Sequence, residues 1–249
     1  MNKPDSIEPT RRNFLGAVAV GAVSAALPVS VDPRAQKEST TPVPAPASVR
    51  SAPRYHAAAI QTAFANPRTR AEIPSRVARM IAMAEQTVAG YGPFFDVRLV
   101  VFPEFAHAAP CYFTTAELDE HLAVEIPNDH TDAYQRFSRK TGCFVQTGSF
   151  IERDPKYPGA LFNTTCLIGP DGILSKYRKV NPWIPWEVHA SPHDIAGYTE
   201  NPFPVADTEI GKLGCAICYD WLFPESIRQL AFNGAEVLIR ISAYMDPWG

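Results

Sequence analysis

Helix-like and strand-like segments alternate along the chain from about residue 55 onward, and this alternation constrains the fold more than any other feature. Three segments have the apolar spacing or the stop signals of helices: residues 73–89, 131–140 and 224–233. Short apolar runs between them predict strands: residues 97–101, 143–150, 161–168, 173–180 and 237–241. Alternating strands and helices pack in layers, so we expect one layered α/β domain over residues 54–249.

The composition suits an enzyme domain with a sizeable core. The apolar fraction, 46%, is ordinary for a globular protein. The net charge of −3 argues against a nucleic acid or an anionic membrane surface as a partner. The five cysteines are dispersed and odd in number, so they do not indicate a disulfide framework, and at least one thiol stays free.

The first 53 residues differ in composition from the rest of the chain. Arg11-Arg12 precede a stretch, residues 14–27, that is rich in glycine and alanine and only mildly apolar. This pattern is typical of a twin-arginine export signal, and the stretch is short for a membrane span. Residues 28–53 are rich in proline and small residues, and we interpret them as a flexible linker. We therefore expect residues 1–27 to direct export to a bacterial periplasm, with no stable membrane span after signal removal.

Cys218 ends an apolar, strand-like run that begins at Lys212. A turn through Tyr219-Asp220 separates it from the helix expected near Pro224. A thiol at such a junction is positioned as a nucleophile, because the sheet can hold its surroundings while the sulfur faces a cleft. The alternative is a small buried apolar residue, the usual role of a free cysteine. Its position alone leaves both interpretations open.

Two further tracts contain groups that a cysteine nucleophile needs. Glu104 follows a strand that Pro103 ends, so its carboxylate lies where open α/β sheets place their chemistry and suits a general base. Lys179, in a basic extended segment, suits stabilisation of an oxyanion. Arg178 and Lys179 should point to opposite faces of the segment, so that one can face solvent while the other faces the interior. Taken singly, Glu104 could be a glutamate at a strand end that is solvated or paired with an arginine. The basic run around Lys179 could likewise be a solvated edge of the sheet.

Together these tracts resemble the carbon–nitrogen hydrolase, or nitrilase, superfamily. Its Glu–Lys–Cys triad is matched in chain order by three motifs: Val101-Phe102-Pro103-Glu104, Tyr177-Arg178-Lys179 and Ile217-Cys218-Tyr219-Asp220. Other segments are similar as well: Ala59-Ile60-Gln61-Thr62, Phe162-Asn163-Thr164 and Gly234-Ala235-Glu236-Val237-Leu238. The similarity covers nearly all of residues 55–249, and the joint order of the motifs is far more specific than any one of them.

The resemblance implies a role for each matched residue. Cys218 corresponds to the nucleophile and Glu104 to the general base. Lys179 corresponds to the oxyanion-stabilising residue, and Glu187 to a second glutamate that positions substrate and assists proton transfer. The implied fold is a four-layer αββα sandwich. The implied reaction is hydrolysis of a small carboxamide to a carboxylate and ammonia through a cysteine acyl-enzyme, with no metal or organic cofactor.

The branch of the family is indicated by two tracts. Residues 179–187 are most similar to aliphatic amidases and formamidases, and Tyr219-Asp220 fits the amidase and carbamoylase branches. The nitrile-cleaving branch usually carries Trp-Glu after the cysteine, so we expect an amide substrate. Trp183, Trp186 and Tyr219 suggest an aromatic-walled substrate site, although tryptophans here also suit core or subunit packing. The resemblance further implies a homo-oligomer joined through helices near the nucleophile.

Several alternatives remain at this stage. Family members continue past the segment matching Gly249, so we expect a sandwich that is incomplete at its C-terminus. A non-catalytic remnant with a binding role, an N-carbamoyl-compound hydrolase and a nitrilase are therefore the alternative functions. Cys215-x-x-Cys218 is a redox motif only where it opens a helix, and on a strand the two thiols face opposite sides. A zinc site that adds His189 and His193 to this pair matches half of the usual signature.

Overall fold

The computed structural model describes residues 53–183 and 186–243. The expected export signal, residues 1–27, lies outside the described residues, as does the expected linker, residues 28–53, except for its last residue. Within the described ranges, no helix is both long enough and apolar enough to cross a membrane.

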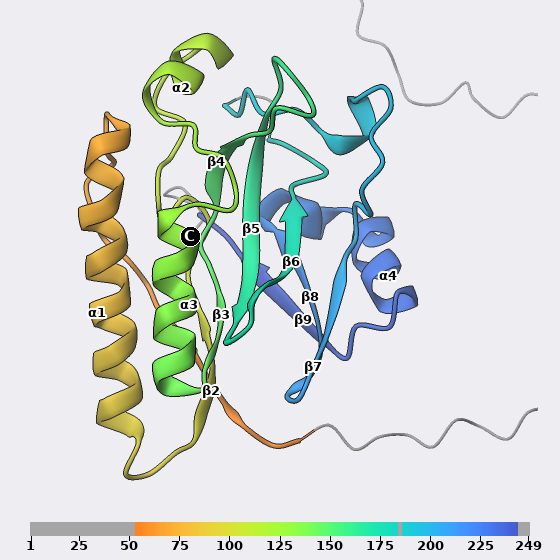
Figure 1. Ribbon diagram of the computed structural model, residues 1–249. Coiled ribbons are helices and arrows are strands. Elements are labelled where there is room, and N and C mark those ends of the chain that lie inside the picture. Colours follow the sequence, from red (N-terminus) through yellow and green to blue (C-terminus); the bar gives the residue numbers. More distant parts are fainter. Residues whose placement is uncertain (1–52, 184–185, 244–249) are drawn as a thin grey trace, which may run out of the picture. The chain divides into compact units, whose positions relative to one another are not determined.

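The larger of two β-sheets has six strands (Figure 1). They are β1 (His56–Ala59), β2 (Val97–Val101), β3 (Phe144–Gln146), β4 (Phe150–Arg153), β5 (Leu161–Gly169) and β6 (Gly172–Arg178). β1, β2 and β3 are parallel, whereas β5 pairs antiparallel with β3, β4 and β6. The predicted hairpin of β5 and β6 is confirmed. Because β6 is antiparallel to β5, and β5 to β3, β6 points the same way as β2.

The smaller sheet has three strands: β7 (Val205–Thr208), β8 (Gly211–Ile217) and β9 (Val237–Ile241). β7 is antiparallel to β8, and β9 is parallel to it. Parallel neighbours need a crossover, and α4 (Pro224–Phe232) provides it. β8 ends at Ile217, so Cys218 lies at the strand end that the sequence predicts.

The remaining helices are α1 (Ile73–Tyr91), α2 (Thr115–His121) and α3 (Asp129–Thr141). α1 and α3 confirm two predicted helices, and α3 starts two residues earlier than expected. It starts there because Asn128 caps it, with its side-chain oxygen accepting hydrogen bonds from the backbone N–H groups of His130 and Thr131. Gly142, at φ 74°, ends the helix in the left-handed conformation that glycine adopts without strain.

Two apolar cores divide the domain into four layers. One lies between the larger sheet and the pair α1 and α3, and it includes Val100 of β2. The other lies between the two sheets, and it includes the preceding residue, Leu99, together with Leu213 of β8. Successive strand residues point to opposite faces, so β2 is apolar on both sides. α4 packs against β8 on the side away from α1 and α3 (Figure 1). This order of helices, sheet, sheet and helix is the expected αββα sandwich.

The prediction of one continuous strand over residues 143–150 is wrong. β3 and β4 both pair with β5 but are separated by three residues. Val145 pairs with Ile168 and Phe150 with Thr164, so five steps on one side oppose four on the other. Such a mismatch is a β-bulge, which ends regular pairing and re-aims the chain. The bulge faces the segment that follows β2, where Glu104 lies.

Gly148, inside this bulge, allows the close approach of that segment. A methyl group at position 148 would lie 2.4 Å from the carbonyl oxygen of Pro103 and 2.4 Å from Cβ of Ala106. We expect Gly148→Ala to lower the free energy of unfolding by about 1–3 kcal/mol, because it overpacks a close-packed interior. The matched control is Gly90→Ala on α1, where a methyl group meets nothing within 4 Å and improves helix propensity. Urea denaturation measures both, and a Gly148→Ala variant as stable as the unaltered protein would contradict the prediction.

Candidate active site

Three buried charged groups meet where β2 and β6 end. Lys179 follows β6 directly, and its Nζ lies 2.8 Å from Oε1 of Glu104, which follows β2. The same Nζ lies 2.6 Å from Oε1 of Glu187, in the loop after β6. The relative exposure is 3% for Glu104, 1% for Lys179 and 6% for Glu187. The structure thus brings three of the four predicted catalytic residues into direct contact.

Besides Lys179, two other parts of the chain donate hydrogen bonds to Glu104. The side-chain amide of Asn163, on β5, donates to its Oε1 at 2.9 Å, and the backbone N–H of Ala243 donates to its Oε2 at 3.0 Å. The next residue, Phe105, adopts φ 55°, and its N–H donates to Oγ of Ser149 in the bulge. Sequence reasoning assigned no role to Asn163, whose only signal is its place in the Phe162-Asn163-Thr164 motif.

Cys218 occupies a strained position beside these charges. It is the first residue of the 3₁₀ segment η3 (Cys218–Leu222), and its φ of 48° lies in the left-handed region, which costs a residue with a side chain about 1–3 kcal/mol. Burial raises the pKa of its thiol to about 11, the charge and hydrogen bonding of Glu104 raise it as well, and Lys179 opposes them. The thiol is therefore neutral near pH 7 and needs a base, and Glu104 is the carboxylate beside it.

The charge on Lys179 is supported by its two carboxylate partners. Burial disfavours the ammonium, but Glu104 and Glu187 outweigh this effect, and the pKa of Lys179 is raised. Burial also raises the pKa of Glu187 to about 7; the charge of Lys179 opposes this rise and that of Glu104 adds to it. Both oxygens of Glu187 accept hydrogen bonds, one from Lys179 and one from the backbone N–H of Trp183 at 3.1 Å. The site can thus hold a fixed cation next to a thiol and a base.

The prediction that one of Arg178 and Lys179 faces solvent is wrong, because both are buried. Arg178 is 2% exposed, and its guanidinium donates to both carboxylate oxygens of Glu152 at 2.8 Å. The Arg178 guanidinium also lies over the ring of Phe162, with its Cζ 4.2 Å from the ring centroid. The two side chains do diverge, but the surface beside Arg178 is covered by the loop residue Tyr198. Arg178 and Lys179 therefore do point in different directions, as in an extended strand, and only the burial of Arg178 was predicted wrongly.

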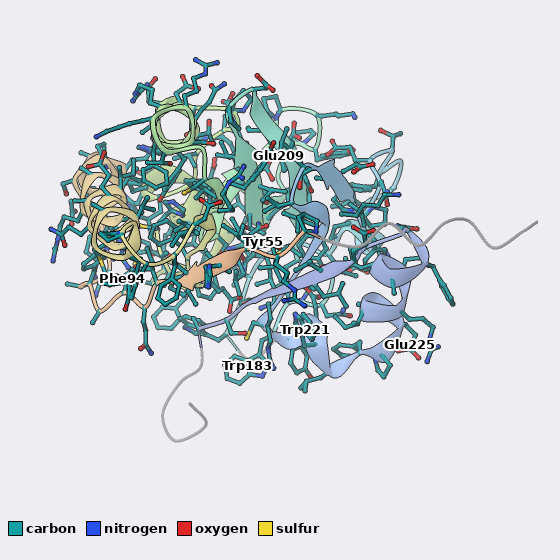
Figure 2. All side chains as sticks on the ribbon, turned by 90° about the horizontal axis from the view of Figure 1, so that it is seen from below. Tyr55, Phe94, Trp183, Glu209, Trp221 and Glu225 are labelled. Atoms are coloured by element: carbon teal, nitrogen blue, oxygen red, sulfur yellow. The ribbon has the colours of Figure 1, made fainter. Side chains whose placement is uncertain are left out.

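The three aromatic candidates for substrate contact are all half-buried. Trp183 is joined to Glu187 through its backbone, and the ring of Trp186 packs edge-on against Phe105 at 5.4 Å. The ring of Tyr219 packs edge-on against Phe223 at 5.2 Å. Figure 2 shows Trp183 at the edge of the molecule, on the side where Trp221 also lies. Trp183 and Trp186 thus flank the charged cluster, while Tyr219 packs toward α4.

The redox and zinc interpretations find no support. Cys215 and Cys218 are both free, and Cys215 lies in the core between the sheets. Among the described residues, no group of three histidine, cysteine or acidic side chains could hold a metal ion. His189 is instead buried beside Phe105, with ring centroids 6.2 Å apart, and burial lowers its pKa to about 3.

Comparison with known proteins agrees with this geometry. The model of one protein family, carbon-nitrogen hydrolase, matches residues 56–248. A formamidase of Bacillus cereus (strain Q1) is 34% identical over 192 residues, which cover 76% of this chain and 54% of that protein. A formamidase of Bacillus thuringiensis (strain Al Hakam) is 34% identical over 178 residues, 71% of this chain and 49% of that protein. The chain thus spans about half the length of the curated relatives that it matches.

Solved structures share the same fold. Nit3 of Saccharomyces cerevisiae, a member of branch 10 of the nitrilase superfamily, superposes with a TM-score of 0.58 at 25% identity, over 72% of this chain and 62% of that one. A carbon-nitrogen hydrolase from Helicobacter pylori G27 gives 0.57 at 22% identity, over 76% of this chain and 60% of that one. The expected nitrilase-like α/β fold is thereby confirmed, and with the family match over residues 56–248 the chain belongs to the carbon-nitrogen hydrolase family.

Proposed function

We propose that this protein hydrolyses a small carboxamide to a carboxylate and ammonia through a cysteine acyl-enzyme. The observation that carries the proposal is the ammonium of Lys179 in contact with both Glu104 and Glu187, next to the thiol of Cys218. A base, a nucleophile and a fixed cation are the groups that acyl transfer from an amide requires. Family membership and the two formamidases named above support the same reaction class.

The first half of the reaction forms the acyl-enzyme. Glu104 takes the proton of the Cys218 thiol as the sulfur attacks the amide carbon, and a tetrahedral intermediate with a negative oxygen results. The ammonium of Lys179 stabilises that oxygen. When the intermediate collapses, the carbon–nitrogen bond breaks, Glu104 returns its proton to the nitrogen, and ammonia leaves. A thioester to Cys218 remains.

The second half releases the acid. Glu104, again a carboxylate, takes a proton from water as its oxygen attacks the thioester carbon. The second tetrahedral intermediate collapses with cleavage of the carbon–sulfur bond, and the proton on Glu104 returns to the sulfur. Glu187 keeps Lys179 in place throughout, because its two oxygens tie that ammonium to the backbone at Trp183. None of these steps requires a metal or an organic cofactor.

The substrate, assembly and compartment are further parts of this proposal. The formamidase relatives favour a short amide, and Trp183 and Trp186 beside Glu187 suit an aromatic wall around it. An N-carbamoyl compound or a nitrile remains the second substrate class, and a protein without turnover is the alternative from another class. Assembly into a homo-oligomer and twin-arginine export through residues 1–27 complete the proposal.

Replacement of the nucleophile tests the reaction directly. Cys218→Ala is expected to abolish ammonia release, a loss of at least about 10⁴-fold, because no other group can form the thioester. The matched control is Cys111→Ala, which removes a half-buried thiol outside the charged cluster and should keep turnover. Ammonia release is measured for both variants. Full activity of Cys218→Ala would contradict the proposed mechanism.

The dependence of the rate on pH tests Glu187. Its pKa is raised to about 7, so it is ionised above that pH and protonated below it. Only the carboxylate accepts from both Lys179 and Trp183, so kcat/KM should fall as the pH drops from 8 to 6, with a midpoint of about 7. Glu187→Gln should be slower at every pH and lack this step, whereas Glu85→Gln, which alters a half-buried glutamate of α1 paired with Lys140 and outside the charged cluster, should keep it. An unchanged step in Glu187→Gln would assign the titration to another group.

A substrate panel separates the branches of the family. We expect ammonia release from formamide and short aliphatic amides, with N-carbamoyl amino acids and nitriles slower by at least about 100-fold, as is typical where a site must pair polar groups of its substrate. The Cys218→Ala variant serves as the blank for each compound. Faster turnover of an N-carbamoyl compound or a nitrile would move the assignment to that branch.

A further inference from the structure

The carboxylate of Asp220 links the nucleophile turn to the end of β6, which Lys179 follows directly. Asp220 lies two residues after Cys218 and is fully buried. Its Oδ2 accepts the hydroxyl of Tyr177 at 2.7 Å and the backbone N–H of Ile217 at 3.0 Å. Its Oδ1 accepts the backbone N–H of Asn181 at 2.7 Å and the side-chain amide of that residue at 3.0 Å. All of these donors come from the two chain segments that contain Lys179 and Cys218.

The positions of these donors along the chain are specific. Tyr177 lies two residues before Lys179 and Asn181 two residues after it, so Asp220 accepts hydrogen bonds from the chain on both sides of the lysine. Ile217 immediately precedes Cys218, so the same carboxylate also closes the turn that holds the thiol. Tyr177 is 1% exposed and belongs to the core between the two sheets. The hydrogen bond from Tyr177 to Asp220 therefore connects β6 of the larger sheet with the turn that follows β8 of the smaller one.

The strained backbone at Cys218 needs such a support. A residue with a side chain relaxes out of φ 48° unless its surroundings hold it there. The hydrogen bonds that Asp220 accepts from Ile217 and Tyr177 oppose that relaxation, because they fix the turn on one side and anchor it to β6 on the other.

We propose that Tyr177 and Asp220 are positioning residues that set the thiol of Cys218 against Lys179 and Glu104 across the interface of the two sheets. They touch neither the reacting atoms nor the charged cluster, so they act through the residues beside them. This inference rests on the proposed roles of Cys218 and Lys179. It adds that the relative placement of these groups depends on one buried carboxylate that the two sheets share.

Tyr177→Phe tests the link with the smallest change, since it removes only the hydroxyl. Its kcat is expected to fall about 10- to 100-fold, as small misplacements of reacting groups do, while KM changes less than about threefold. Asp220→Asn should give a similar or larger loss. The kcat of the double variant should be only slightly lower than that of the slower single variant, because both substitutions remove the same hydrogen bond. If Asp220→Asn does not fold, Tyr177→Phe alone carries the test.

A second readout follows the thiol itself. Iodoacetamide labelling of Cys218 over a range of pH, read by peptide mass spectrometry, reports the pKa of that thiol. A thiol released from burial and from Glu104 should titrate closer to the ordinary value of about 8.5. Labelling of Tyr177→Phe at pH 8 should therefore become faster while its turnover becomes slower. A general loosening of the fold would speed the labelling of the buried Cys143 and Cys166 as well, whereas loss of this one link should speed only that of Cys218.

The matched control is Tyr134→Phe. Tyr134 is another fully buried tyrosine, and its hydroxyl contacts Nε2 of His107 at 2.9 Å in the core between α3 and the larger sheet. This variant should lose thermal stability but keep the kcat and the labelling profile of the unaltered protein. Unchanged kcat and labelling in Tyr177→Phe, or equal effects in Tyr134→Phe, would overturn the inference. If the unaltered protein hydrolyses nothing, the proposed function fails, and the labelling profiles still decide whether the link positions Cys218.

Discussion

A lysine ammonium buried between two carboxylates is the interaction on which the rest of this structure depends. An unpaired ion in a protein interior costs several kcal/mol, so Lys179 stays charged only while Glu104 and Glu187 lie against it at 2.8 and 2.6 Å. This requirement brings the ends of β2 and β6 and the loop after β6 to one place. It also leaves Glu104 beside the thiol of Cys218, so the contacts that make the burial of charge tolerable are the ones that the chemistry uses.

Three consecutive residues at the end of β6 explain how a polar site fits inside a four-layer sandwich. Tyr177 points into the core between the sheets and reaches Asp220 beneath the nucleophile turn. Arg178 points the other way and pairs with Glu152 under a cover of aromatic rings. Lys179 then enters the charged cluster. Three successive buried polar side chains are tolerated only if each one finds a partner, and each of these three does.

The sequence predicted the elements well where the signal is local. The apolar spacing of α1 and the β-branched run of β2 both depend on residues within a single helix or strand. The sequence did not predict the bulge around Gly148, because that bulge depends on the register against β5 and on the approach of Pro103. It also misjudged Arg178, since a basic run along a strand gives no sign of the loop that covers one of its residues.

The sequence by itself determined that the chain is a layered α/β protein of the carbon-nitrogen hydrolase family, and it singled out Glu104, Lys179, Glu187 and Cys218 as the residues of interest. Only the tertiary structure decided how they are held: by Asn163 and the backbone of Ala243 on Glu104, and by Asp220 on the turn of Cys218. The physical reason is that a hydrogen bond between segments 59 or 139 residues apart leaves no local pattern in either one. Strand ends and motifs are local in the sequence and can be predicted from it, whereas the partners of a buried charge depend on how the two sheets pack together.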